Sequence, residues 1–302
     1  MKHYLGIDVG GTNIKFALMD PEGNLLQKGE LPTPETSLEA YLDTLAVIRG
    51  RFPEAEALVM SAPGKIDADR GYFYTGGALS YIGGTDLPGL LEPRIGIPVC
   101  VENDGKCAAL AELWQGAMLG VRTGAVMTIG TAIGGAVIID GKLHRGASFA
   151  AGEFSWMATQ FDEEYGIPQL WGCRSGVAAL TGRYEARKGL AEGSVDGRAF
   201  FAALQDGDPD AAETLETYSA FLARGIVSLQ AVLEAERIAI GGGVSRQPAL
   251  IGAIDREVGA VWEHMGAWLP MRRPEIVACR FGNDANLLGA LYHYLELNGR
   301  PE

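Results

Sequence analysis

Apolar residues at the start of the chain fall into two short runs, 4–9 and 14–19, separated by the polar, glycine-rich stretch 10–13. Their β-branched and aromatic content, with a glycine turn between them, is typical of a β-hairpin. A third run around Leu25 and Leu26 follows a turn-like Pro-Glu-Gly-Asn sequence. Apolar residues then recur at helical spacing over 37–49, with Ser37 as the cap. The pattern predicts that the chain begins strand, strand, strand, helix.

The same pattern returns in the middle of the chain, where residues 125–139 form two apolar runs around a Gly/Thr turn. We interpret the two hairpins as one structural unit used twice. Residues 145–180 are rich in glycine and aromatics without a sustained period, which predicts loops lining a site. The remaining expected elements are strands over 57–64, 97–104 and 237–241 and helices over 105–118, 211–233 and 283–295.

Glycine is unusually frequent, with 42 among 302 residues, about twice the roughly 7% of average usage. The glycines have no three-residue period and prolines number only 14, so a collagen-like or flexible polymer is excluded. The formal charge of −13 disfavours nucleic acid and anionic membrane as partners and favours a small molecule. Four dispersed cysteines and the lack of a signal-like apolar segment predict a soluble protein of the cytoplasm.

Three glycine turns each follow a predicted strand, at 8–12, 130–135 and 241–243. Glycine lets main-chain N–H groups approach an anion closely, and Thr12 and Thr131 add hydroxyl donors. Any one of these turns is equally consistent with ordinary β-turn chemistry. Together they predict a cradle for a polyphosphate, although none fits the P-loop or the Rossmann fingerprint.

Two aspartates follow predicted buried strands. Asp8, directly before the first glycine turn, is a candidate ligand of Mg²⁺, directly or through water, while the alternative is that it caps its own turn. Asp104 is placed to cap the helix that begins near Gly105, which is the plain structural explanation. The functional hypothesis is a carboxylate held ionised by helix-terminal amides, which orients a hydroxyl and takes its proton during phosphoryl transfer.

Glu153 and the tryptophans near it are candidates for sugar binding. Glu153 can accept hydrogen bonds from two adjacent hydroxyls, and Trp156 or Trp171 can stack on the apolar face of a sugar ring. The alternatives are a solvated glutamate and tryptophans that fill the core. The four histidines are isolated from the cysteines, so no zinc site is predicted.

The ordered motifs resemble the ROK family of sugar kinases and repressors. They are LGIDVGGTNIK near the start, SAPG at 61–64, VENDGKCAALAE at 101–112, TIGTAIGGAVI at 128–138, GEFSW at 152–156, IAIGGGVS at 238–245 and DANLLGA at 284–290. The resemblance implies an α/β fold of the actin/hexokinase type (ribonuclease H-like), with two duplicated domains and an interdomain cleft that closes on sugar and ATP. The implied domains are 1–117, completed by a C-terminal helix in 284–302, and 118–283, in a homodimer.

The resemblance also assigns roles to individual residues. It implies that Asp104 is the catalytic base and that Asn103 and Glu153 bind sugar hydroxyls, with Gly64 and Gly77 bordering the sugar pocket and Trp156 beside it. The implied phosphate-binding residues are Gly10, Gly11, Thr12, Gly130 and Thr131, and Gly241, Gly242 and Gly243 lie beside the adenosine. We place Asp8, Lys15 and Gly134 with this nucleotide-binding set.

Two departures from the family pattern bear on the substrate. The usual Gly-Glu-x-Gly-His is here Gly152-Glu153-Phe154-Ser155-Trp156, and the cysteine-rich zinc motif that normally follows is missing. The sequence is therefore similar to the zinc-less branch that includes β-glucoside kinases. Loss of the histidine would open the pocket near the anomeric side of the sugar and make room for a glycoside.

The resulting prediction is an ATP- and Mg²⁺-dependent kinase that phosphorylates O6 of a hexose or β-glucoside. The first alternative is a ROK-type sugar-sensing regulatory protein without kinase activity. Family repressors carry a DNA-binding segment ahead of the first glycine turn, yet Asp8 lies close to the start of this sequence. A second alternative is an actin-like ATPase, for which a carboxylate base beside an amide has no evident use.

Overall fold

The computed structural model describes residues 2–160 and 169–299. The chain forms two compact units, each taken here by itself. Unit 1 consists of Met1–Gln115, Arg145–Ala151 and Asp284–Glu302, and unit 2 of Gly116–His144 and Gly152–Asn283. The expected domain boundaries stay a prediction, and they place 145–151 in the second domain, whereas this segment packs within unit 1.

Unit 1 is built on a five-stranded sheet in the order β3-β2-β1-β4-β8. The predicted hairpin is confirmed, because β1 and β2 pair antiparallel and β3 continues the meander. Strands β4 and β8 run parallel to β1, so the carboxyl ends of these three strands lie at the same edge of the sheet. The strands are β1 (Tyr4–Val9), β2 (Asn13–Met19), β3 (Leu25–Pro32), β4 (Ala57–Ala62) and β8 (Val99–Asn103).

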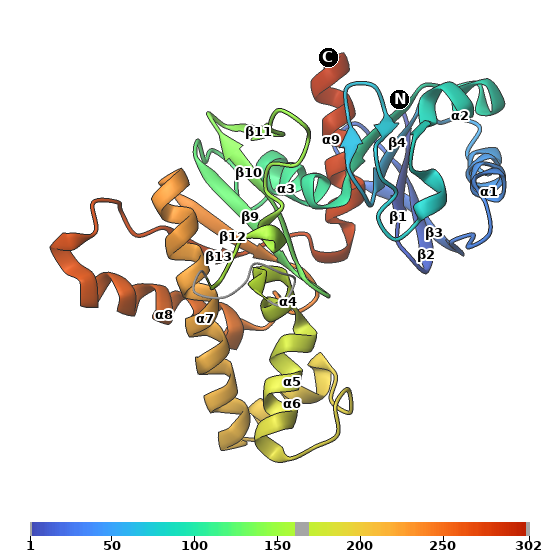
Figure 1. Ribbon diagram of the computed structural model, residues 1–302. Helices are drawn as coiled ribbons and strands as arrows, with labels where there is room; N and C mark the ends of the chain where they lie inside the picture. The colour runs from blue at the N-terminus through green and yellow to red at the C-terminus, as the bar shows by residue number, and fades with distance from the viewer. Residues whose placement is uncertain (1, 161–168, 300–302) are drawn as a thin grey trace. The chain divides into compact units, whose positions relative to one another are not determined.

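Helices cover both faces of this sheet. Alternate residues of β1 point to opposite faces, with Leu5 and Ile7 in one cluster and Tyr4 in the other. The first cluster packs against α1 (Leu38–Gly50) and α2 (Leu87–Ile95), and the second against α3 (Asp104–Gln115) and α9 (Ala285–Asn298). Figure 1 shows α9 on one side of β1 and β4, with α1 and α2 on the other. The predicted first and last helices are thereby confirmed.

A small three-stranded sheet extends from the end of β4. Its strands are β5 (Ile66–Asp67), β6 (Tyr72–Phe73) and β7 (Thr85–Asp86), and the 3₁₀ turn η1 (Ser80–Ile82) precedes β7. Phe73 and Ile82 are fully buried in the core of unit 1. These short elements hold the loop between residues 62 and 85 against the main sheet.

Unit 2 repeats the topology of unit 1. Its sheet has the order β11-β10-β9-β12-β13, again with an antiparallel meander followed by two parallel strands. This repetition confirms the predicted second hairpin and its likeness to the first. The strands are β9 (Gly124–Ile129), β10 (Ile133–Ile139), β11 (Lys142–His144), β12 (Arg237–Gly241) and β13 (Glu275–Ala278).

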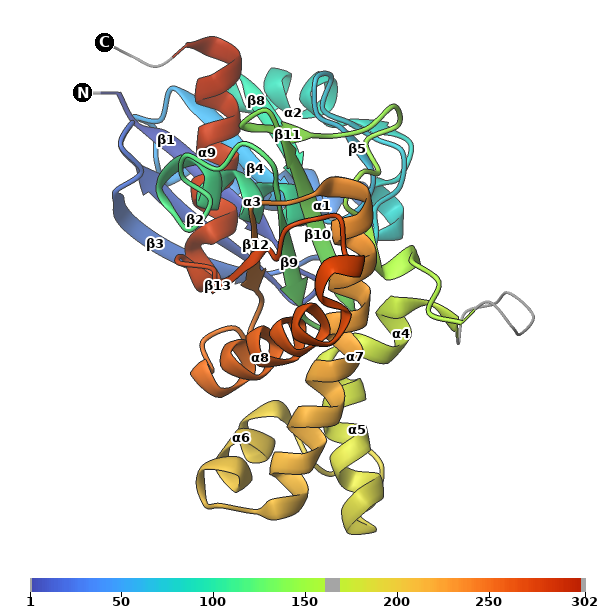
Figure 2. The same cartoon turned by 90° about the vertical axis from the view of Figure 1, so that its left-hand side faces the viewer.

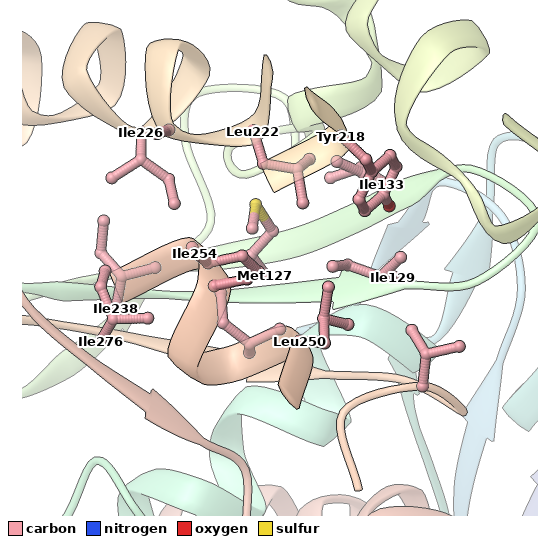
Figure 3. Packing of buried hydrophobic residues seen from close by; sticks show 14 of the residues in the cluster. Met127, Ile129, Ile133, Tyr218, Leu222, Ile226, Ile238, Leu250, Ile254 and Ile276 are labelled. Carbon is pink, nitrogen blue, oxygen red and sulfur yellow. The ribbon is translucent and has the colours of Figure 1, made fainter. Parts of the chain in front are cut away.

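The core of unit 2 lies between this sheet and two long helices, α7 (Pro209–Leu233) and α8 (Pro248–Met265). Figure 3 shows Met127 and Ile129 of β9 facing Leu222 of α7 and Leu250 of α8. Figure 2 shows α5 (Val177–Lys188) and α6 (Gly197–Gln205) beside the N-terminal part of α7. Helix α7 confirms the long amphipathic helix expected over 211–233.

The loops expected over 145–180 are only partly present. Residues 154–156 form the 3₁₀ turn η2, Trp171–Ser175 form α4, and α5 starts at Val177. Trp171 of α4 and Leu180 of α5 are buried in the core of unit 2. The elements η2 and α4, with three and five residues, are too short to show a helical period in the sequence. Residues 161–168 of this stretch lie outside the described residues. Over 2–160 and 169–299, no helix combines the length and the apolar character needed to cross a bilayer.

Candidate active site

The acceptor loop, as we call residues 102–104, lies where β8 gives way to α3. The Asn103 side chain accepts a hydrogen bond from the Lys106 N–H (3.2 Å) through Oδ1. Its Nδ2 donates to the Gly64 carbonyl (2.9 Å) and to Asp104 Oδ1 (3.0 Å). Asn103 therefore caps the helix, and the expectation that Asp104 is the N-cap is wrong.

Asp104 is instead the first residue of α3. Its Oδ1 also accepts a hydrogen bond from the Gly105 N–H (2.8 Å). The carboxylate thus lies at the helix N-terminus, where the helix dipole and the first N–H groups favour its ionised form. Asn103 rather than Asp104 therefore makes the capping bond, and the Asp104 carboxylate is held at the start of the helix by Asn103 and Gly105.

Gly64 and Gly77 form the wall beside Asn103. Gly64 has φ +105°, and a Cβ at this position would lie 2.1 Å from the Thr75 carbonyl oxygen. A side chain at Gly77 would lie 3.1 Å from the Gly64 nitrogen. The structure therefore brings together Asn103, Asp104, Gly64 and Gly77, four residues assigned to the sugar pocket from the sequence.

Behind the acceptor loop lies a buried charge network that the sequence pattern gave no reason to expect. The Glu102 side chain is fully buried and accepts hydrogen bonds from the Asn103 N–H (2.8 Å) and from Arg145 Nε (2.8 Å). Arg145 Nη2 lies 3.1 Å from His293 Nδ1 on α9. Since arginine can only donate, Nδ1 accepts this bond and carries no proton.

We expect the free energy of unfolding to fall as the pH drops below about 6.5, in part because of His293. Burial lowers the pKa of His293 from its usual 6.5, with Arg145 acting in the same direction and Glu102 and Asp69 opposing it. The unfolded chain therefore binds a proton at a pH where the folded protein does not. Stability from this group is complete above pH 6.5 and is lost between 6.5 and the lowered pKa.

The variant His293→Gln tests this, because glutamine keeps an acceptor for Arg145 but does not titrate. Urea unfolding of both proteins between pH 5 and 7.5 should show a smaller loss of stability at low pH for the variant. Parallel curves for the two proteins would contradict the assignment.

The first glycine turn lies at the same edge of the unit 1 sheet. Asp8 is 8% exposed, and burial raises the pKa of its carboxyl, opposed by the hydrogen bond from Asn286 Nδ2 (2.9 Å) and by the charge of Lys15. The partner of Asp8 thus comes from α9, not from the turn that Asp8 was alternatively expected to cap. Asn286 was missed, although it belongs to the DANLLGA motif.

The backbone of this turn is held by Thr33, the residue that follows β3, and borders the predicted sugar pocket. Thr33 donates its hydroxyl to the Gly10 carbonyl (2.7 Å) and its N–H to the Thr12 carbonyl (2.8 Å). A Cβ at Gly11 would lie 3.9 Å from the Ala78 Cβ, next to Gly77. Within unit 1, one predicted phosphate turn therefore borders the predicted acceptor pocket.

The second and third glycine turns lie side by side in unit 2. A Cβ at Gly242 would lie 2.2 Å from the Ile129 carbonyl oxygen, immediately before Gly130 and Thr131. Helix α5 starts at the same place, since its Val177 N–H donates to the Gly130 carbonyl (2.8 Å). An N-terminal helix end beside exposed turns suits a phosphate. The pattern of the sequence had not indicated this helix end.

Glu153 and Trp156 belong to unit 2, where Glu153 precedes the 3₁₀ turn η2 and Trp156 is its last residue. Phe154 is buried and the Ser155 hydroxyl donates to the Ile133 carbonyl, so the turn is fixed on β10. Glu153 is exposed and Trp156 is 67% exposed. Trp171, by contrast, is 1% exposed in the core, so the expectation that it could stack on a sugar is wrong. The roles of Glu153 and Trp156 stay predictions.

Asp8 is the residue of this site that could hold Mg²⁺. Among residues 2–160 and 169–299, no three His, Cys, Asp or Glu side chains are grouped to bind an ion. Asp8 offers one buried carboxylate beside a glycine turn. Mg²⁺ is commonly held by one or two carboxylates together with waters and substrate phosphates. Asp8 fits that arrangement when a nucleotide supplies the other oxygens.

The chain is similar along its whole length to known proteins. It is 32% identical to a β-glucoside kinase of Klebsiella pneumoniae over 98% of this chain and 97% of the relative. A ROK family protein of Streptococcus pneumoniae, solved in complex with sucrose, superposes with a TM-score of 0.87 at 31% identity, covering 98% and 99% of the two chains. A ROK family glucokinase of Streptomyces griseus, solved with glucose and AMPPNP, gives 0.79 at 28% identity, covering 96% and 98%.

These neighbours confirm the predicted fold of the actin/hexokinase type, whose duplicated α/β topology both units display. The family model described as "ROK family" matches residues 4–296. The resemblance inferred from seven short motifs thus extends to nearly every residue of the protein, and the chain belongs to the ROK family.

Proposed function

We propose that the protein transfers the γ-phosphoryl group of ATP to O6 of a β-glucoside or hexose, with Asp104 as the base. Its similarity over nearly the whole chain to a β-glucoside kinase and a glucokinase supports an ATP-dependent sugar kinase. The identity of the acceptor and the roles of individual residues are our proposal. The observation that carries these roles is the capping of α3 by Asn103, which leaves Asp104 beside Gly64 and Gly77.

In the proposed mechanism Asp104 accepts a hydrogen bond from the acceptor hydroxyl and removes its proton as the oxygen attacks the γ-phosphorus. The P–O bond to ADP breaks as the new P–O bond forms. Asn103, fixed by its bonds to Gly64 and Lys106, recognises a neighbouring hydroxyl. N–H groups of the glycine turns and the start of α5 stabilise negative charge on the phosphates.

We assign Asp8 as the residue that would hold Mg²⁺, directly or through water. When bound, the ion supplies positive charge that neutralises the phosphate oxygens. Asp8 is kept in place by Asn286 of α9, and Lys15 pairs opposite it on β2. A buried carboxylate with a raised pKa gains most from a cation next to it.

An aromatic pair near the acceptor loop supports a glycoside as the acceptor. Tyr74 is 46% exposed and stacks on Phe149, with ring centroids 6.4 Å apart and an interplanar angle of 29°. Tyr74 lies beside Thr75, whose carbonyl contacts Gly64. Phe149 has φ +61°, a conformation that strains a bulky residue and is found at ligand-binding positions. The pair offers a surface for the second ring of a glycoside.

A panel of phosphoryl acceptors tests this function. Coupled ADP release would be measured with glucose, fructose, N-acetylated hexosamines, cellobiose and gentiobiose, and without sugar. We expect kcat/KM to be highest for a β-glucoside. Strong preference for free monosaccharides would remove the glycoside proposal and leave the kinase intact, whereas ATP hydrolysis indifferent to every sugar would contradict the kinase itself.

The variant Tyr74→Ala belongs in the same panel. We expect it to lower kcat/KM for disaccharides by about 10-fold, in line with one to two kcal/mol of aromatic contact, and to leave glucose unchanged. Trp268→Ala is the matched control, since Trp268 is an 87% exposed aromatic of unit 2. An equal loss for glucose and cellobiose would contradict the second-ring role.

The alternative of a sugar-sensing regulator is less well supported, because two of the three relatives described above carry the names of kinases. A homodimer and a cytoplasmic location stay predictions.

A further inference from the structure

The segment Arg145–Ala151, which we call the arm, joins β11 of unit 2 to η2 of the same unit but packs within unit 1. Its two ends meet, because the Ala151 N–H donates to the Arg145 carbonyl (3.1 Å). The arm is therefore a closed loop of unit 1, and Arg145 lies at one of its two joined ends.

The Arg145 side chain is fixed on the acceptor loop. Its Nε donates to Glu102 Oε2 (2.8 Å), and the other oxygen of Glu102 accepts the Asn103 N–H (2.8 Å). Glu102 has no exposed side-chain surface, so its charge relies on these partners instead of water. His293 Nδ1 accepts a further bond from Arg145 Nη2 (3.1 Å) and ties the guanidinium to α9.

We propose that Arg145 is a positioning residue of the sugar site, which sets Asn103 and Asp104 through Glu102 and is itself carried by the closed arm of unit 1. The inference rests on the proposed function, since it concerns the residues that would bind and deprotonate the acceptor. Arg145 does not itself act on the sugar. It joins two segments of unit 1 that are far apart in the sequence, the acceptor loop and the arm.

The physical reason is the behaviour of a buried ion pair that loses one partner. Without the guanidinium, Glu102 is left as a buried carboxylate that lacks one of its two described donors, and it turns toward another donor. This change weakens its bond to the Asn103 N–H and lets the acceptor loop shift. A displacement of about 1 Å in a reacting group costs on the order of 10²-fold in rate.

The test compares Arg145→Gln, Arg145→Lys and Glu102→Gln with the wild type. We expect Arg145→Gln to lower kcat for sugar phosphorylation by about 30- to 100-fold. The KM for ATP and the slow ATP hydrolysis without sugar should stay unchanged, because the glycine turns are not touched. Arg145→Lys should recover part of kcat. The double variant Arg145→Gln/Glu102→Gln should lose no more than the worse single variant, since the two residues act as one unit.

Arg122→Gln is the matched control, because Arg122 pairs with Asp140 on the surface with both side chains about three-quarters exposed. It should change neither kcat nor stability appreciably. Urea unfolding gives the folded fraction of each variant, so that kcat refers to folded protein only. If Arg145→Gln does not fold, Arg145→Lys and Glu102→Gln carry the test.

Variants with normal kcat per folded molecule, or with sugar-free ATP hydrolysis reduced in parallel, would overturn the positioning role and assign the network to stability alone. That result would leave the kinase proposal standing. A wild-type protein that phosphorylates no sugar would overturn both.

Discussion

The Asp104→Asn variant should bind sugar and ATP but lose about 10³-fold in kcat, within the range that removal of a general base produces. Asparagine has the shape of aspartate, and its side-chain oxygen can still accept the hydrogen bond from the Gly105 N–H. The capping bond from Lys106 goes to Asn103, so the start of α3 should be preserved. What the variant lacks is a group that takes up the hydroxyl proton. Coupled ADP release with a saturating acceptor measures the loss, and acceptor binding is followed separately by thermal shift.

Asp86→Asn is the control for this substitution. Asp86 also lies at the start of a helix of unit 1, and its carboxylate does cap that helix by accepting from the Gly89 N–H (3.1 Å). It should leave kcat unchanged. Near-normal turnover of Asp104→Asn with intact sugar binding would show that Asp104 is not the base.

Gly289→Ala should destabilise the protein by about 2–3 kcal/mol, although alanine is the better helix former. A Cβ at Gly289 of α9 would lie 1.8 Å from the Cys107 carbonyl oxygen of α3, closer than any side chain can approach. The two helices must therefore move apart. Because α3 begins at Asp104, kcat should also fall. Urea unfolding, analysed with an unchanged m-value, measures the loss.

Gly182→Ala provides the opposite case. Gly182 lies within α5, and a Cβ there would meet no atom within 4 Å. Alanine should therefore stabilise by about 0.5–1 kcal/mol through helix propensity alone. Equal effects at positions 182 and 289 would refute the argument from helix contact.

The two hairpins and four of the helices, α1, α3, α7 and α9, were predictable because each carries a local signal, whereas α2, α5 and α8 were not predicted. The hairpins of β1/β2 and β9/β10 are recognisable as pairs of apolar runs around glycine turns. In α7, apolar residues recur at helical spacing along a helix of 25 residues. The short helices α4 and α6 were not predicted, since five and nine residues give too few periods to recognise. Their positions are fixed by tertiary packing, as the burial of Trp171 and Phe200 shows.

Some residues of the candidate site were predicted from the sequence and others were not. The residue types and their order pointed to Asn103, Asp104, Gly64 and Gly77, which unit 1 brings together. Which of two adjacent polar residues caps α3 depends on side-chain direction, and the sequence favoured the wrong one. Partners such as Arg145 and His293 lie 43 and 191 residues from Glu102, and no local pattern relates such distant positions.

The return of α9 to unit 1 has a consequence for how the protein folds during synthesis. Leu287 and Leu291 of α9 cover the face of the sheet that carries Tyr4 and Val59. The ribosome makes α9 after the last strand of unit 2, so that face has only α3 as cover while unit 2 is being completed. Unit 1 starts first and finishes last. The nascent chain therefore presents an apolar sheet surface for most of translation, the stage at which such surfaces are prone to aggregate.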